Sequence, residues 1–126
     1  MPMANDFTDL LIWQRSSDLL KEAVMDIESF PSKVGARQLG DQLFRSVSAI
    51  SANIAEGFGR RTRKELVRSC AIARGEIDES RNWYFQCERV GLLKDAVVKE
   101  RSASLIELRK MISSFIAKTN AADTKS

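Results

Sequence analysis

The residues best suited to chemistry form a run of positive side chains in the middle of the chain. Four positive charges fall within five positions, on Arg60, Arg61, Arg63 and Lys64. Arginine can bind a phosphate through two parallel hydrogen bonds, and the amino end of a helix favours anions. The run therefore indicates a contact with the phosphate backbone of RNA or DNA, to which two later cations would add, Arg68 and Arg74.

An alternative interpretation is that this run is only a solvated turn, whose charges pair with Asp9, Asp18 or Glu22 of another helix. Residues 31–75 carry nine basic and three acidic side chains, whereas residues 1–30 carry two and six. Such an excess can attract a polyanion or complement an acidic helix, so both interpretations stay open. No zinc-finger, homeodomain or RNA-binding sheet motif is present, and little base preference is expected.

A second group of polar residues precedes the run. Asn53 and Glu56 stand three positions apart and so share one face of a predicted helix. A buried carboxylate needs a partner, which Arg45, Arg60 or Arg74 could supply. We predict a structural hydrogen-bond network of Asn53, Glu56 and Arg45 in preference to a catalytic or small-molecule site.

The composition argues against an enzyme, because the chain contains no histidine. Histidine is the side chain most used for acid and base catalysis near neutral pH and is the commonest metal ligand. A di-iron site in a helical bundle also needs two histidines beside its carboxylates. We expect no enzymatic activity, no metal and no cofactor. Cys70 and Cys87, roughly 25 Å apart on one predicted helix, are expected to be buried free thiols.

Four amphipathic helices are predicted to position these residues. Apolar side chains recur at spacings of three and four over about residues 8–29, 36–57, 62–90 and 95–119. Thr8 is expected to cap the first helix, with Phe7 packed on Ile12. Thr62 and Glu65 have the spacing of a capping box at the start of the third.

The breaks between these patterns are short. Pro31 ends the first helix, Gly57 and Gly59 are predicted to form the turn after the second, and Gly91 ends the third. Residues 120–126 are predicted to be a disordered tail. Short connections imply antiparallel neighbours, and the expected fold is an all-α, antiparallel up-down-up-down four-helix bundle that forms a single domain over residues 1–126.

Length and hydropathy are consistent with one compact domain. The chain has 126 residues, of which 44% are hydrophobic, enough for one core. No apolar run is long enough to cross a bilayer, and the N-terminus lacks the basic and apolar regions of a signal peptide. We therefore expect a cytoplasmic protein that makes no membrane contact.

The third and fourth predicted helices carry more apolar side chains than one core needs. The additional residues are Ile72, Trp83, Phe85, Ile106 and Ile116. A second apolar stripe indicates an interface between copies of the chain. The alternative is that these side chains lie at widened bundle edges or stand singly in solvent.

Several short blocks resemble one known family in their order and approximate spacing. The family comprises the proteins encoded by intervening sequences within bacterial 23S ribosomal RNA genes, and the resemblance covers about residues 7–92. The blocks are Phe7-Thr8-Asp9-Leu10, Trp13-Gln14, Phe30-Pro31, Gln42-Leu43, Arg45-Ser46, Ser48, Asn53 to Arg60, and Ile72 to Gly75. The chain departs from the pattern at Glu76, where a small serine is expected.

The resemblance implies a four-helix bundle that in some relatives assembles as a homopentameric ring or barrel. The family is also distantly similar to the accessory protein of diversity-generating retroelements, a basic pentamer that binds nucleic acid and a reverse transcriptase. We therefore expect a non-enzymatic oligomeric scaffold or adaptor, a homopentamer, that contacts RNA or DNA through the basic run. The alternative is a structural or protein-interaction module with no nucleic-acid partner.

Overall fold

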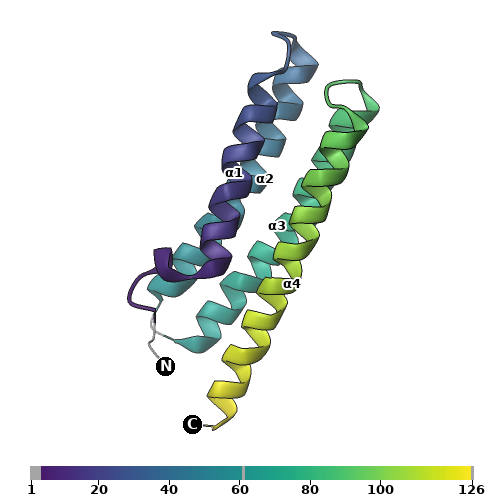
Figure 1. Cartoon of the computed structure of the whole chain (residues 1–126). Helices are drawn as coiled ribbons and strands as arrows, with labels where there is room; N and C mark the ends of the chain where they lie inside the picture. The colour runs from purple at the N-terminus through teal and green to yellow at the C-terminus, as the bar shows by residue number, and fades with distance from the viewer. Residues whose placement is uncertain (1–3, 61, 126) are drawn as a thin grey trace.

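The computed structural model describes residues 4–60 and 62–125, within which it contains four long helices and no strand (Figure 1). The helices are α1 (Leu11–Glu28), α2 (Val34–Gly59), α3 (Arg63–Arg89) and α4 (Asp95–Lys125), preceded by a short 3-10 helix, η1 (Phe7–Asp9). Successive long helices run in opposite directions in Figure 1. The predicted all-α, up-down-up-down bundle is confirmed.

The first helix begins later than expected, because η1 has a cap of its own. The Asp6 carboxylate accepts a hydrogen bond from the Thr8 amide (3.4 Å), and the Asp9 carboxylate accepts one from the Asp6 amide (3.1 Å). The capping residue is therefore Asp6 and not Thr8. Phe7 packs edge-on against Trp13, with ring centroids 5.3 Å apart. The locally satisfied turn delays α1 to Leu11.

In the connection between α2 and α3, the predicted cap at the start of α3 is confirmed, but the predicted glycine turn at the end of α2 is wrong. Thr62 caps α3, since its Oγ1 accepts from the Glu65 amide (3.2 Å). Gly57 and Gly59 were expected to form the turn, but α2 stays helical through both. Gly91, which ends α3 as predicted, is the one glycine with positive φ among the described residues (82°).

The buried Gly57 has a packing role. A Cβ atom at this position would lie 2.5 Å from the Ser69 Cβ, so the glycine is what lets α2 and α3 approach so closely. Farther along the same seam, the buried Ser80 hydroxyl donates to the Ser46 hydroxyl (2.9 Å). Small residues on α2 therefore make the α2–α3 contact the most extensive of the bundle.

The fourth helix is longer than expected, which corrects the predicted disordered tail. α4 continues through Lys125, and Ser126 lies outside the described residues. No glycine or proline follows Gly91, so nothing in the local sequence stops the helix, and Ala121 and Ala122 favour its continuation.

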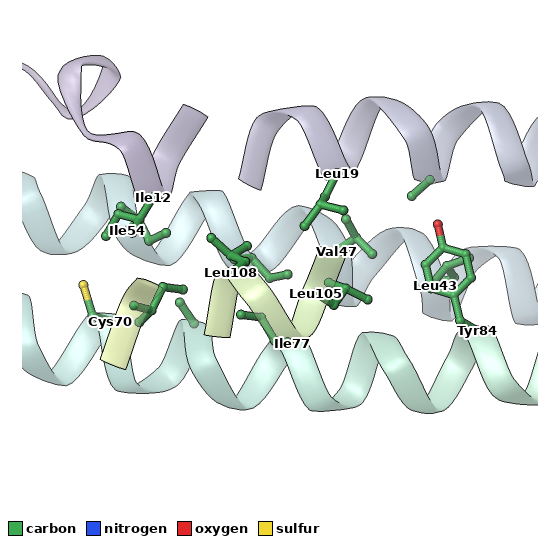
Figure 2. Packing of buried hydrophobic residues seen from close by; sticks show 14 of the residues in the cluster. Ile12, Leu19, Leu43, Val47, Ile54, Cys70, Ile77, Tyr84, Leu105 and Leu108 are labelled. Atoms are coloured by element: carbon green, nitrogen blue, oxygen red, sulfur yellow. The ribbon is translucent and has the colours of Figure 1, made fainter. Parts of the chain in front are cut away.

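Apolar side chains from all four helices form one continuous core. Figure 2 shows Ile12 and Leu19 of α1 facing residues of the other helices. The largest fully buried aliphatic side chains are Leu43, Ile50, Ile54, Ile77, Leu105, Leu108 and Ile112. Cys70 and Cys87 are buried free thiols, as predicted, and desolvation raises the pKa of each to about 11. Within the described residues no helix is long and apolar enough to span a membrane.

A buried ionic cluster crosses this core near the end of the bundle where α3 joins α4. It comprises Glu22 and Asp26 of α1, Tyr84 of α3 and Arg101 of α4. The Asp26 carboxylate accepts from the Tyr84 hydroxyl (2.7 Å) and from Arg101 Nε and Nη2 (2.8 and 3.1 Å), and Arg101 Nη1 donates to Glu22 (2.8 Å). Burial and the hydrogen bond to Asp26 raise the pKa of the Tyr84 hydroxyl. The cluster therefore ties three helices together; Figure 2 shows the Tyr84 hydroxyl pointing towards α1.

Candidate nucleic-acid interface

The predicted basic run lies where α2 ends and α3 begins. Arg60 is the residue that follows α2, Arg63 and Lys64 are the first two residues of α3, and Arg68 lies about one turn farther along. All four are exposed. Arg61, also predicted to belong to the run, lies outside the described residues. We use "basic run" below for Arg60, Arg63, Lys64 and Arg68.

Two of these cations lie at the amino end of α3, where a positive charge destabilises a helix. The backbone dipoles of a helix leave partial positive charge at its amino end, which attracts anions and disfavours cations. Arg63 and Lys64 nevertheless begin α3, and Glu65 is the acidic residue of that first turn. The helix dipole does not favour these two residues, whereas an external anion would be attracted by both the side chains and the helix end.

Arg60 is engaged within the protein. Its Nη2 donates to Glu56 Oε1 (3.0 Å), one turn earlier on α2, and the two side chains are 54% and 61% exposed. The hydrogen bond to Glu56, then the charges of Glu56 and Glu65, raise the pKa of Arg60. The guanidinium therefore has an internal anionic partner that solvent can reach.

Beside this pair, residues of α2 and α3 line a hollow of about 270 Å³. Its lining mixes both charges with neutral polar side chains and one apolar side chain: Asn53, Glu56, Arg60, Glu65, Arg68, Ser69 and Ile72. The hollow thus gathers residues that the sequence had placed in three separate groups, namely the basic run, the polar network and the copy-to-copy interface.

Arg74 does not belong with the basic run. It is half-buried, and its Nη1 donates to the Ser113 hydroxyl of α4 (3.1 Å). Arg74 follows Arg68 by six positions, which turns its side chain well away from the face of α3 that borders α2. Its observed contact links α3 to α4.

The polar network predicted for Asn53, Glu56 and Arg45 is not observed as one buried network. The Asn53 side-chain amide donates to the Ala49 carbonyl of its own helix (2.8 Å), Glu56 is exposed beside Arg60, and Arg45 is exposed with its charge near Glu76. Each polar group finds a partner on its own helix or near the surface. These residues therefore do not form the buried polar link of the bundle.

Sequence reasoning missed the ionic cluster that does provide this link. Asp26 and Arg101 are 75 positions apart, so no local spacing connects them. A signal was nevertheless present on α1. The buried stripe of that helix is Ile12, Ser16, Leu19, Ala23 and Asp26. A carboxylate in line with an apolar stripe predicts a buried partner of opposite charge.

The profile of the family described as 23S rRNA-intervening sequence protein matches residues 8–114, which include the entire basic run and hollow. The chain belongs to this family. The resemblance inferred from the sequence blocks is therefore confirmed.

A solved structure agrees with the fold of this family member. It is a protein with unknown function from the S23 ribosomal protein family of Bacteroides thetaiotaomicron VPI-5482, similar over 84% of this chain and 98% of its own, with a TM-score of 0.75 and 20% identity. At this identity the likeness establishes the bundle fold. No curated protein matches the chain.

The side chains of the intervening-sequence protein that were predicted to face another copy differ in their exposure. Ile72 (47% exposed) lines the hollow between α2 and α3. Phe85 (40% exposed) lies under the Arg81 guanidinium, which also donates to Ser102 of α4. The other three are partly buried: Trp83, Ile106 and Ile116. Trp83 keeps a buried indole nitrogen without a hydrogen-bond partner.

The described residues also bear on metal chemistry. Among them, no group of three or more histidine, cysteine, aspartate or glutamate side chains could hold a metal ion. The hollow contains the carboxylates of Glu56 and Glu65. However, Arg60 donates a hydrogen bond to Glu56, and Arg68 lines the same hollow. The positive charges of Arg60 and Arg68 beside these carboxylates disfavour a bound cation.

Proposed function

We propose that this intervening-sequence protein is a non-enzymatic helical scaffold that assembles with copies of itself and contacts the phosphate backbone of RNA or DNA through its basic run. The observation that carries the proposal is the exposure of four cations around the amino end of α3, two of them within its first turn. Cations at that position are unfavourable to the helix but favourable to a bound phosphate.

The chemistry of the run supports contact with the backbone of a nucleic acid. No aromatic side chain lines the hollow beside the run, so the hollow itself offers no ring on which a base would stack. Arginine and lysine contacts to phosphate carry no sequence information. We therefore propose binding with little base preference, in the cytoplasm, where both RNA and DNA are accessible.

Assembly would convert a weak contact into a strong one. The resemblance to the family supports a homopentamer, and exposed Phe44, Ile72 and Phe85 supply apolar surface for contacts between copies. A ring that repeats the basic run once in each copy would engage several phosphates of one strand at once. Affinity should then fall steeply as salt releases these contacts.

Size-exclusion chromatography with light scattering checks the assembly. The expected mass at micromolar concentration is about five times the 14.2 kDa of one chain. A second measurement at tenfold lower concentration separates a stable ring from a weak association, because only the latter shifts mass on dilution. A monodisperse species of 14.2 kDa at both concentrations would contradict self-assembly.

Neutralising the basic run checks the contact with nucleic acid. The variant Arg60→Gln, Arg63→Gln, Lys64→Gln, Arg68→Gln is expected to bind labelled single-stranded RNA and duplex DNA roughly tenfold more weakly at low salt, with a shallower dependence of affinity on salt. Fluorescence anisotropy over a salt series measures both.

The matched control removes the same number of exposed charges at the other end of the bundle, through Lys33→Gln, Arg37→Gln, Arg89→Gln and Lys94→Gln. This control should bind nearly as the unmodified protein does. Equal weakening by the two variants would show that only overall charge matters, and no binding at low salt would favour a protein-interaction module without a nucleic-acid partner.

A further inference from the structure

In the free protein, the ion pair with Glu56 offsets the positive charge of Arg60, one of the four cations of the basic run. Glu56 precedes Arg60 by four positions at the end of α2, with 3.0 Å between Oε1 and Nη2. Glu65 of α3 lines the same hollow, and its charge also raises the pKa of Arg60. Arg60 therefore has a carboxylate of α2 and a carboxylate of α3 near its guanidinium.

The exposure of this pair makes the contact reversible. Exposed ion pairs change an equilibrium by no more than roughly fivefold, since water and salt screen them and two long side chains must be ordered. A phosphate group can offer the same guanidinium two parallel hydrogen bonds. Arg60 is therefore held by Glu56 in the free protein but can be taken over by a dense polyanion.

We propose that Glu56 acts as an internal competitor of nucleic acid: it occupies Arg60 in the free protein and so lowers the affinity of the basic run for phosphate. This inference rests on the proposed function and assigns Glu56 a regulatory role within that same site. A nucleic acid brings several phosphates to the run and can displace the carboxylate, whereas an isolated phosphate ion gains too little from one arginine. The pair thereby favours polyanions over small anions.

The test replaces Glu56 by glutamine, which keeps the shape of the side chain and removes its charge. The Glu56→Gln variant is expected to bind single-stranded RNA roughly two- to fivefold more tightly at low salt, with a log–log salt slope steeper by about one or less, because Arg60 becomes free to contact a phosphate. The matched control is Glu28→Gln, which removes another exposed negative charge at the last residue of α1.

A double-mutant cycle shows whether the effect acts through Arg60. In the Arg60→Gln background, the further change Glu56→Gln should alter affinity less than twofold or so, since no guanidinium remains to be released. An unchanged gain in that background, or the same gain from Glu28→Gln, would overturn the role of Glu56 and leave only a general effect of charge.

The outcomes separate this inference from the proposed function. If the unmodified protein binds through the basic run and Glu56→Gln binds no tighter, the competitor role fails alone. Binding that appears only in the Glu56→Gln variant supports the competitor role. If neither protein binds RNA or DNA at low salt, both the nucleic-acid contact and the role of Glu56 are overturned.

Discussion

Replacing Arg101 by methionine is expected to lower the free energy of unfolding by about 3 to 5 kcal/mol, because the change leaves the Asp26 carboxylate buried without an opposite charge. Asp26 is 9% exposed and would keep only the hydrogen bond from the Tyr84 hydroxyl. Methionine fills much of the volume of the arginine, so the loss reports on charge more than on packing. Urea unfolding followed by circular dichroism measures the effect, at one fixed protein concentration because assembly shifts apparent stability.

The control for this substitution lies on the same helix. Lys99 pairs with Asp95 (3.0 Å) on the exposed side of α4, and Lys99→Met should leave the stability nearly unchanged. Adding Asp26→Asn to Arg101→Met should recover part of the loss, since it removes the stranded charge. A free energy of unfolding for Arg101→Met indistinguishable from that of Lys99→Met would show that the buried ionic cluster does not stabilise the bundle.

Replacing Gly57 by alanine is expected to lower the free energy of unfolding by about 1 to 3 kcal/mol, because the new Cβ overlaps a tightly packed neighbour. The Cβ would meet the Ser69 Cβ at 2.5 Å and the Ser69 Oγ at 3.0 Å, so α2 and α3 would have to move apart. The first of these atoms is fixed to the α3 backbone and cannot rotate away. The same denaturation experiment measures the loss.

Gly75 provides the matched comparison. It is an exposed glycine within α3, and a Cβ atom there would have nothing within 4 Å. Gly75→Ala should therefore raise the free energy of unfolding by up to about 1 kcal/mol, the difference in helix propensity. Adding Ser69→Gly to Gly57→Ala should relieve the overlap. Equal effects of alanine at positions 57 and 75 would mean that close approach is not the reason for Gly57.

The fold was predictable because its determinants are local. The apolar spacing, the break at Pro31, the cap at Thr62 and the terminator at Gly91 all act within a few residues, and each is found in the structure. The boundaries that were wrong depend on competition between local and tertiary effects. Asp6 caps a short 3-10 helix, and α1 therefore starts later in the chain than predicted. Gly57 is required by the close packing of α2 against α3 and not by a turn.

The candidate site was predictable only in part. The basic run falls within residues 60–68, so its place at the end of α2 and the start of α3 followed from the helix boundaries. The exposure and the partners of individual side chains could not be predicted in this way. Arg74 and Glu56 could each have faced the core or the solvent, and their orientation depends on how α2, α3 and α4 pack together. The ionic cluster depends on residues 58 and 75 positions apart, whose pairing requires the full arrangement of the bundle.

The distance between the buried ionic cluster and the basic run has a consequence for engineering. Lys64 and Tyr84 lie twenty positions apart on α3, which is roughly 30 Å along its axis. Substitutions that far apart with no shared partner combine additively. The contribution of the ionic cluster to stability and the proposed affinity of the basic run for a polyanion should therefore be adjustable independently of each other.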